Sequence, residues 1–106
     1  MDEGVFMVTV EFSRPPVVRV AGELDLAGAP GLTSVLRALD GDVELHCSGL
    51  EFIDAAGLSV LVKAHRRCAA QGHKLVVVDP SPAVVRILRL VDLDSVLYVS
   101  RNGDAS

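Results

Sequence analysis

The fold is decided by one stretch of the sequence, Leu50-Glu51-Phe52-Ile53-Asp54-Ala55-Ala56-Gly57-Leu58. Asp54 stands where a side-chain oxygen can accept from the free backbone N–H groups of Ala56 or Gly57, which predicts a helix beginning at about Ala55. Ala55, Ala56 and Gly57 leave that helix start almost bare of side chains. Either a partner's backbone or an anion approaches it closely, or the small residues serve packing against a sheet. The residues alone leave both interpretations open.

On both sides of this stretch, segments with an apolar residue at every second position alternate with segments in which apolar residues recur every three to four positions. They predict strands at residues 6–12, 17–21, 43–48, 75–78 and 96–99, and helices at about 30–39, 55–71 and 82–91. Arg14-Pro15-Pro16 joins the first two strands as a hairpin, and Gly22 is expected to end the second. The continuous apolar run at 75–78 is typical of a strand covered on both faces.

The resulting order, β-β-α-β-α-β-α-β, predicts an α/β fold with a mixed sheet of four to five strands and helices packed on it. Half of the 106 residues are apolar, including 18 Val, 14 Leu and 11 Ala, and only four are aromatic. Such a chain can build an aliphatic core without disulfides. We expect one domain over residues 1–100 and a short polar tail over 101–106.

Charge and hydropathy exclude several classes of partner. The net charge of −4 argues against binding held mainly by phosphate charge, so direct nucleic-acid binding is not expected. No run approaches the roughly 18 to 20 apolar residues of a membrane span. Met1-Asp2-Glu3-Gly4 carries acid where a secretory signal carries Lys or Arg, and two cysteines are too few for a disulfide framework. A soluble cytoplasmic protein without membrane insertion is the expectation.

Known enzyme motifs are absent from the sequence. There is no phosphate-binding loop, dinucleotide fingerprint, nucleophile elbow or His-Glu-x-x-His. Asp25 and Asp54 both follow apolar strands and precede helices, but no nucleophile or cation accompanies them. We therefore predict no enzymatic activity and no cofactor.

A metal site is likewise not expected. The candidate ligands lie among ordinary core residues or on opposite strand faces; they are His46, Cys47, His65, Cys68 and His73. A local basic cluster is interpreted as a solvated helix end; it comprises Lys63, Arg66, Arg67 and Lys74.

At the Asp54 segment the sequence resembles the STAS family, the domain of bacterial anti-sigma factor antagonists. The family's Asp-Ser-Ser/Thr-Gly-Leu motif is matched by Asp54-Ala55-Ala56-Gly57-Leu58, and Gly22-Glu23-Leu24-Asp25 resembles its Gly-Glu/Asp-Leu-Asp. Val78-Asp79-Pro80-Ser81-Pro82 fits the family's fourth strand and third-helix entry. The likeness runs over about residues 6–99, and the element order is the family's.

The resemblance implies a protein-binding switch of the partner-switching type, in which the unphosphorylated antagonist binds a serine-kinase anti-sigma factor and releases a sigma factor. It places the partner-binding residues at Glu23, Asp25, Asp54, Ala55, Ala56, Gly57, Leu58 and Ser59. Phosphorylation of the hydroxyl residue before the glycine abolishes binding in such proteins. Added negative charge beside Asp54 gives a physical reason.

The sequence departs from the family pattern at this phosphoacceptor position. Ala56 has no hydroxyl, so phosphorylation there is excluded. Either the protein is a permanently unphosphorylated antagonist or its control has moved elsewhere, and Ser48 and Ser59 are the nearest hydroxyls. Asp92 stands where a glycine commonly ends the third helix. The alternative function is a structural or ligand-responsive STAS subunit of a signalling scaffold or an ABC-type lipid transporter. A weak homodimer is left open.

Overall fold

The protein folds around one five-stranded sheet in the order β1-β2-β3-β4-β5. The structure is a computed structural model that describes residues 5–101; the predicted tail, beyond Arg101, lies outside them. The strands are β1 (Phe6–Glu11), β2 (Val17–Leu24), β3 (Val43–Ile53), β4 (Leu75–Val78) and β5 (Tyr98–Ser100). The helices are α1 (Ala29–Arg37), α2 (Ala55–Ala70) and α3 (Pro82–Leu90). The predicted element order and the mixed sheet are confirmed.

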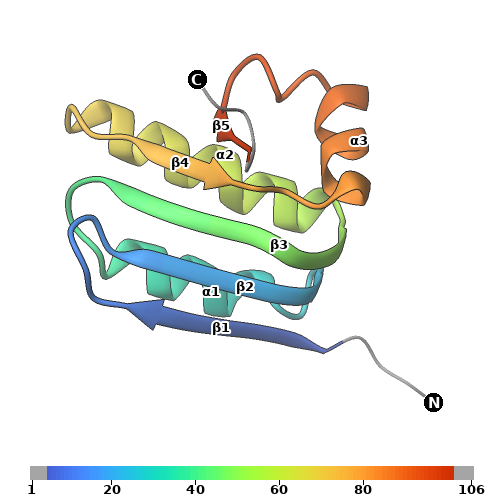
Figure 1. Ribbon diagram of the computed structural model, residues 1–106, viewed down its shortest axis with the longest axis horizontal. Coiled ribbons are helices and arrows are strands. Elements are labelled where there is room, and N and C mark those ends of the chain that lie inside the picture. The colour runs from blue at the N-terminus through green and yellow to red at the C-terminus, as the bar shows by residue number, and fades with distance from the viewer. Residues whose placement is uncertain (1–4, 102–106) are drawn as a thin grey trace.

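Strand directions follow from the connections between the strands. The short turn after Glu11 makes β1 antiparallel to β2, and β2, β3, β4 and β5 are mutually parallel. Each parallel step crosses over through one helix, as a parallel connection requires. In Figure 1, α1 and α2 lie behind the sheet, and α3 lies at the end of the molecule to which β4 points.

The core lies between one face of the sheet and the helices. Alternate strand residues such as Val18, Leu45 and Val77 are fully buried, and Leu32 and Leu61 meet them from α1 and α2. The prediction that both faces of β4 are covered holds only in part. Leu75 and Val77 are buried, whereas Val76 and Val78 on the other face are half-buried.

Two strands run further than their local sequence indicates. Gly22 does not end β2 but lies inside it at φ +92°, where an added Cβ would collide with the backbone oxygen of Val5. Pairing continues past it, since the Glu23 N–H donates to the Val5 oxygen at 2.9 Å. β3 continues to Ile53, so the four residues before Asp54 are strand.

The helix starts and ends follow the sequence signals. Asp54 caps α2 by accepting from the Gly57 N–H, and Ser81 caps α3 by accepting from Val84. Asp92 adopts φ 59° just after α3, the left-handed conformation that Asp tolerates better than most residues. Asp92 therefore occupies the left-handed position at the end of α3, as expected for a residue that stands in for glycine.

Candidate functional site

Asp25 and Asp54 lie side by side at the carboxyl ends of β2 and β3. Leu24 and Ile53, the last residues of the two strands, are register partners. The Asp54 N–H donates to the Leu24 carbonyl oxygen at 3.2 Å, which ties the two strand ends together. The fold therefore brings together two motifs that lie about 30 residues apart in the sequence.

Both carboxylates accept hydrogen bonds from backbone N–H groups. Asp25 Oδ1 accepts from Ala27 at 3.1 Å and from Gly28 at 3.2 Å, which turns the chain into α1. Asp54 Oδ1 accepts from Gly57 at 3.1 Å, as the helix-cap prediction required. Each carboxylate therefore holds a helix start in place.

The small residues at the start of α2 have different roles, one in packing against the sheet and two in keeping the surface free of long side chains. Gly57 is buried, and an added Cβ would lie 2.7 Å from both the Leu24 oxygen and Ile53 Cγ1, closer than real Cβ contacts. Gly57 therefore serves close packing of α2 against the strand ends. Ala55 is exposed, while Ala56 is half-buried and packs against the core, so only short side chains cover this helix start.

The other predicted site residues lie around this helix start. Glu23 is half-buried in β2 beside Phe52 of β3. Leu58 is half-buried and packs against the core, and Ser59 is half-buried on the next turn of α2. Ser48, the other hydroxyl considered as a phosphoacceptor, is exposed in β3.

A groove between α1 and α2 begins at Ala56 and Ser59. Its volume is about 550 Å³. Leu26, in the loop before α1, lines the groove and is 76% exposed, while Phe52 is 46% exposed beside Glu23. The sequence analysis did not predict the groove or the exposure of Leu26. One signal was present: Leu26 does not belong to the apolar stripe of the following helix, so that helix does not bury it.

Three cations line the same groove, Arg37 from α1 and Lys63 and Arg67 from α2. The basic cluster predicted from sequence is thus split. Lys63 and Arg67 face the groove, whereas Lys74 lies with its Nζ 5.0 Å from the centre of the Tyr98 ring. The site combines a small-residue helix start, an exposed apolar side chain and a basic wall.

Both cysteines are free thiols. Burial raises the pKa of the Cys47 thiol to about 12, and burial also raises the pKa of Cys68. Within residues 5–101, no group of three or more His, Cys, Asp and Glu side chains could hold a metal ion. No helix of that range has both the length and the apolarity to cross a bilayer.

Comparison with known proteins identifies the family and the fold of the chain. The sequence profile of the family described as "Mlab, STAS domain" matches residues 8–98. The chain belongs to the STAS domain family. The anti-sigma-B factor antagonist of Bacillus subtilis (strain 168) is 26% identical to this STAS domain over 90 residues, covering 82% of this chain and 83% of that protein.

Solved structures of anti-sigma factor antagonists share the fold. That of Mycobacterium paratuberculosis superposes with a TM-score of 0.82 at 26% identity, over 94% of this chain and 89% of that one. The antagonist SpoIIAA in its unphosphorylated form gives 0.78 at 19% identity, over 92% and 90%. Its phosphorylated form, from Bacillus, gives 0.73 at 17% identity, over 92% and 93%. This STAS domain is therefore similar in sequence and in fold to anti-sigma factor antagonists.

Proposed function

We propose that this protein captures a serine-kinase anti-sigma factor in the bacterial cytoplasm and thereby releases a sigma factor. The observation that carries the proposal is the open start of α2, where Ala55 is exposed beside the paired strand ends of Asp25 and Asp54. A partner's backbone can approach such a surface without meeting a long side chain. The protein acts by binding, without catalysing a reaction or using a cofactor.

The surrounding surface supports a protein partner. Leu26 is a large apolar side chain that exposes 76% of its area next to the helix start. Buried apolar anchors surrounded by polar groups contribute most of the affinity in protein interfaces. In the proposed complex Leu26 is the anchor, and the cations of the groove, Lys63 among them, meet acidic groups of the kinase.

Phosphorylation would not release this complex at the helix start. SpoIIAA, which shares the fold, has been solved in unphosphorylated and phosphorylated forms. In the present protein the position before Gly57 is Ala56, which offers no hydroxyl. We infer that the antagonist stays competent to bind when the kinase has ATP.

A charge placed at position 56 tests where the partner binds. In Ala56→Glu a carboxylate stands in for the charge of a phosphate, and we expect at least tenfold weaker binding to the purified anti-sigma factor kinase of the same organism, since about 1.4 kcal/mol corresponds to tenfold. Isothermal titration calorimetry measures the affinity. Ala83→Glu is the matched control, because Ala83 is also the second residue of its helix; it should bind like the unmodified protein.

Equal affinities for Ala56→Glu and Ala83→Glu would place the interface elsewhere. Failure of the unmodified protein to bind any anti-sigma factor kinase of its organism would contradict the function itself. The second candidate, a structural STAS subunit of a scaffold or lipid transporter, is favoured by one observation, the missing hydroxyl at Ala56. It predicts co-purification with permease and ATPase components in place of a kinase.

A further inference from the structure

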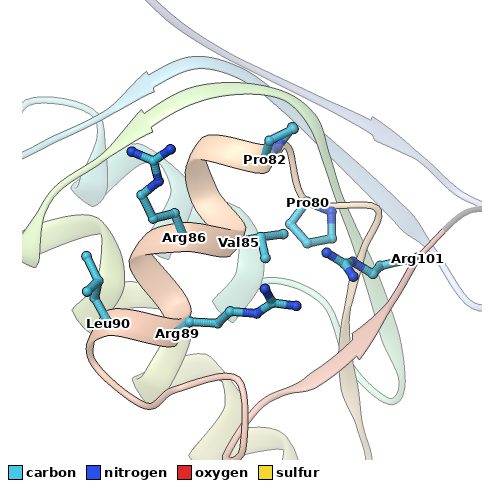
Figure 2. Close-up of a pocket in the computed structure, with 7 residues that line it drawn as sticks. All are labelled: Pro80, Pro82, Val85, Arg86, Arg89, Leu90 and Arg101. Atoms are coloured by element: carbon cyan, nitrogen blue, oxygen red, sulfur yellow. The ribbon is translucent and has the colours of Figure 1, made fainter.

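A hollow lies on the side of α3 that faces away from the core. Three arginines line it, Arg86 and Arg89 of α3 and Arg101 after β5. Its volume is about 510 Å³, within the range of small-molecule sites. Figure 2 shows Arg89 and Arg101 reaching toward each other from opposite sides, whereas Arg86 extends away from them. The hollow is separate from the groove between α1 and α2 described above.

Helix α3 and the end of β5 set the backbone positions from which the two facing arginines extend. The Asp79 N–H, just after β4, donates to the Ser100 carbonyl oxygen at 2.6 Å. This bond brings the residues that follow each strand, Pro80 and Arg101, to one place. On α3, Val84 and Leu88 are buried in the core, so Arg89 lies on the outer side that faces the hollow.

The wall between the arginines is apolar. It is formed by Pro80, Pro82, Val85 and Leu90. Pro80 is buried and therefore fixed, while Leu90 is 77% exposed at the rim. A ligand that fills the hollow would gain apolar contact here in addition to any contact with charge.

The arginines have no anionic partner in the described part of the chain. No carboxylate lines the hollow, and within residues 5–101 no ion pair or hydrogen bond engages the three guanidinium groups. Among the described residues, no carboxylate stands between the two facing guanidinium groups, so both are available to an anion.

The charge and shape of the hollow indicate the class of ligand. An arginine fork binds phosphate or carboxylate with two parallel hydrogen bonds. A phosphate monoester carries about −1.5 to −2 charges at pH 7, which balances the two positive charges of Arg89 and Arg101. A carboxylate carries a single negative charge and balances only one of them. We propose that this hollow binds a phosphate monoester attached to an apolar group.

Such a group has two sources, a free small molecule or a phosphorylated side chain of another protein. Phenyl phosphate represents the first and the peptide acetyl-Leu-phosphoserine-Leu-amide the second. Each is titrated into the ¹⁵N-labelled full chain and followed by NMR. We expect saturable shifts of the backbone amides of Val85, Arg89 and Arg101, and the probe that binds more tightly identifies the source.

Control ligands separate the two halves of the site. Inorganic phosphate lacks the apolar part and benzoate lacks the second charge, so each should bind about tenfold more weakly than the better probe. Absence of saturable shifts at this site with both probes would overturn the proposal. Equal binding of benzoate would overturn the assignment to phosphate.

Variants connect the binding to the two arginines. Arg89→Gln and Arg101→Gln should each weaken binding about tenfold, because each removes one charged fork. Arg14→Gln is the control, since Arg14 is an exposed arginine between β1 and β2 and should change nothing. The same spectra show that the variants remain folded. Unchanged binding in both Arg89→Gln and Arg101→Gln would contradict the site, whatever the outcome for the kinase.

Discussion

Individual residues around the carboxyl ends of β2 and β3 explain why the start of α2 packs closely on the sheet and carries only short side chains. Gly57 allows α2 to approach Leu24 closely. Its N–H lies in the first helical turn, where no partner exists within the helix, and donates to Asp54 instead. Ala55 and Ala56 then keep the surface open. The first of these roles is structural, so substitutions at Gly57 should report on stability.

Gly57→Ala should lower the free energy of unfolding by about 1–3 kcal/mol, the usual cost of overpacking. The added methyl would meet backbone as well as side-chain atoms, so the helix start must shift. Urea denaturation measures the change. Gly31→Ala is the matched control, because a Cβ at Gly31 of α1 meets nothing within 4 Å; alanine there should be neutral or stabilising by up to about 1 kcal/mol. Equal losses in both variants would contradict the packing role of Gly57.

The buried thiol of Cys47 predicts a pH dependence of stability. Burial raises its pKa from 9.0 to about 12, so on raising the pH the unfolded chain loses the proton before the folded chain does. Stability from this group is present below pH 9 and is lost as the pH rises toward 12, by up to about 1.4 kcal/mol per unit.

Denaturation curves between about pH 8 and 11 test this dependence. Cys47→Ala should be less stable at neutral pH, because it leaves a cavity, but should lose less stability as the pH rises. The comparison cancels the titration of lysines and tyrosine, which both proteins share. Parallel pH profiles would show that the thiol does not titrate with unfolding.

At the scale of elements, the order of strands and helices was predictable because it rests on local periodicity. The extent of two strands was not. A glycine marks a turn in sequence, but Gly22 is required inside β2 by the close approach of the Val5 oxygen, a contact between different strands. Likewise, β3 extends past Gly49 because it pairs with β2 along its length, and no local pattern records that pairing.

A charge reversal on α2 tests the basic wall of the groove. Lys63 and Arg66 are both cations of α2, but only Lys63 lines the groove with α1. If the kinase presents acidic groups to the groove, Lys63→Glu should weaken capture by about tenfold at low salt, and less at high salt. Arg66→Glu makes a closely matched charge change on the same helix and should alter affinity less than about twofold. Surface plasmon resonance at two salt concentrations distinguishes the variants, and equal effects would contradict a role for the groove.

At the scale of the whole molecule, the strand ends along one edge of the sheet gather the surfaces that matter. β2 and β3 end just before Asp25 and Asp54, and β4 and β5 end beside the arginine hollow. Sequence motifs predicted the first pair, since each motif is a short local signal. The groove and the hollow were not predictable, because each forms only when helices and strands distant in sequence pack together.

On the function proposed above, this antagonist binds its kinase without being switched off by phosphorylation at position 56. Restoring the hydroxyl in Ala56→Ser tests this property, with kinase binding measured by calorimetry in the presence of ADP or of ATP. We expect ATP to weaken binding of Ala56→Ser, with a phosphate found on the introduced serine by mass spectrometry, and to leave the unmodified protein bound. Loss of binding of the unmodified protein in ATP would contradict the proposal, and so would failure of both proteins to bind the kinase.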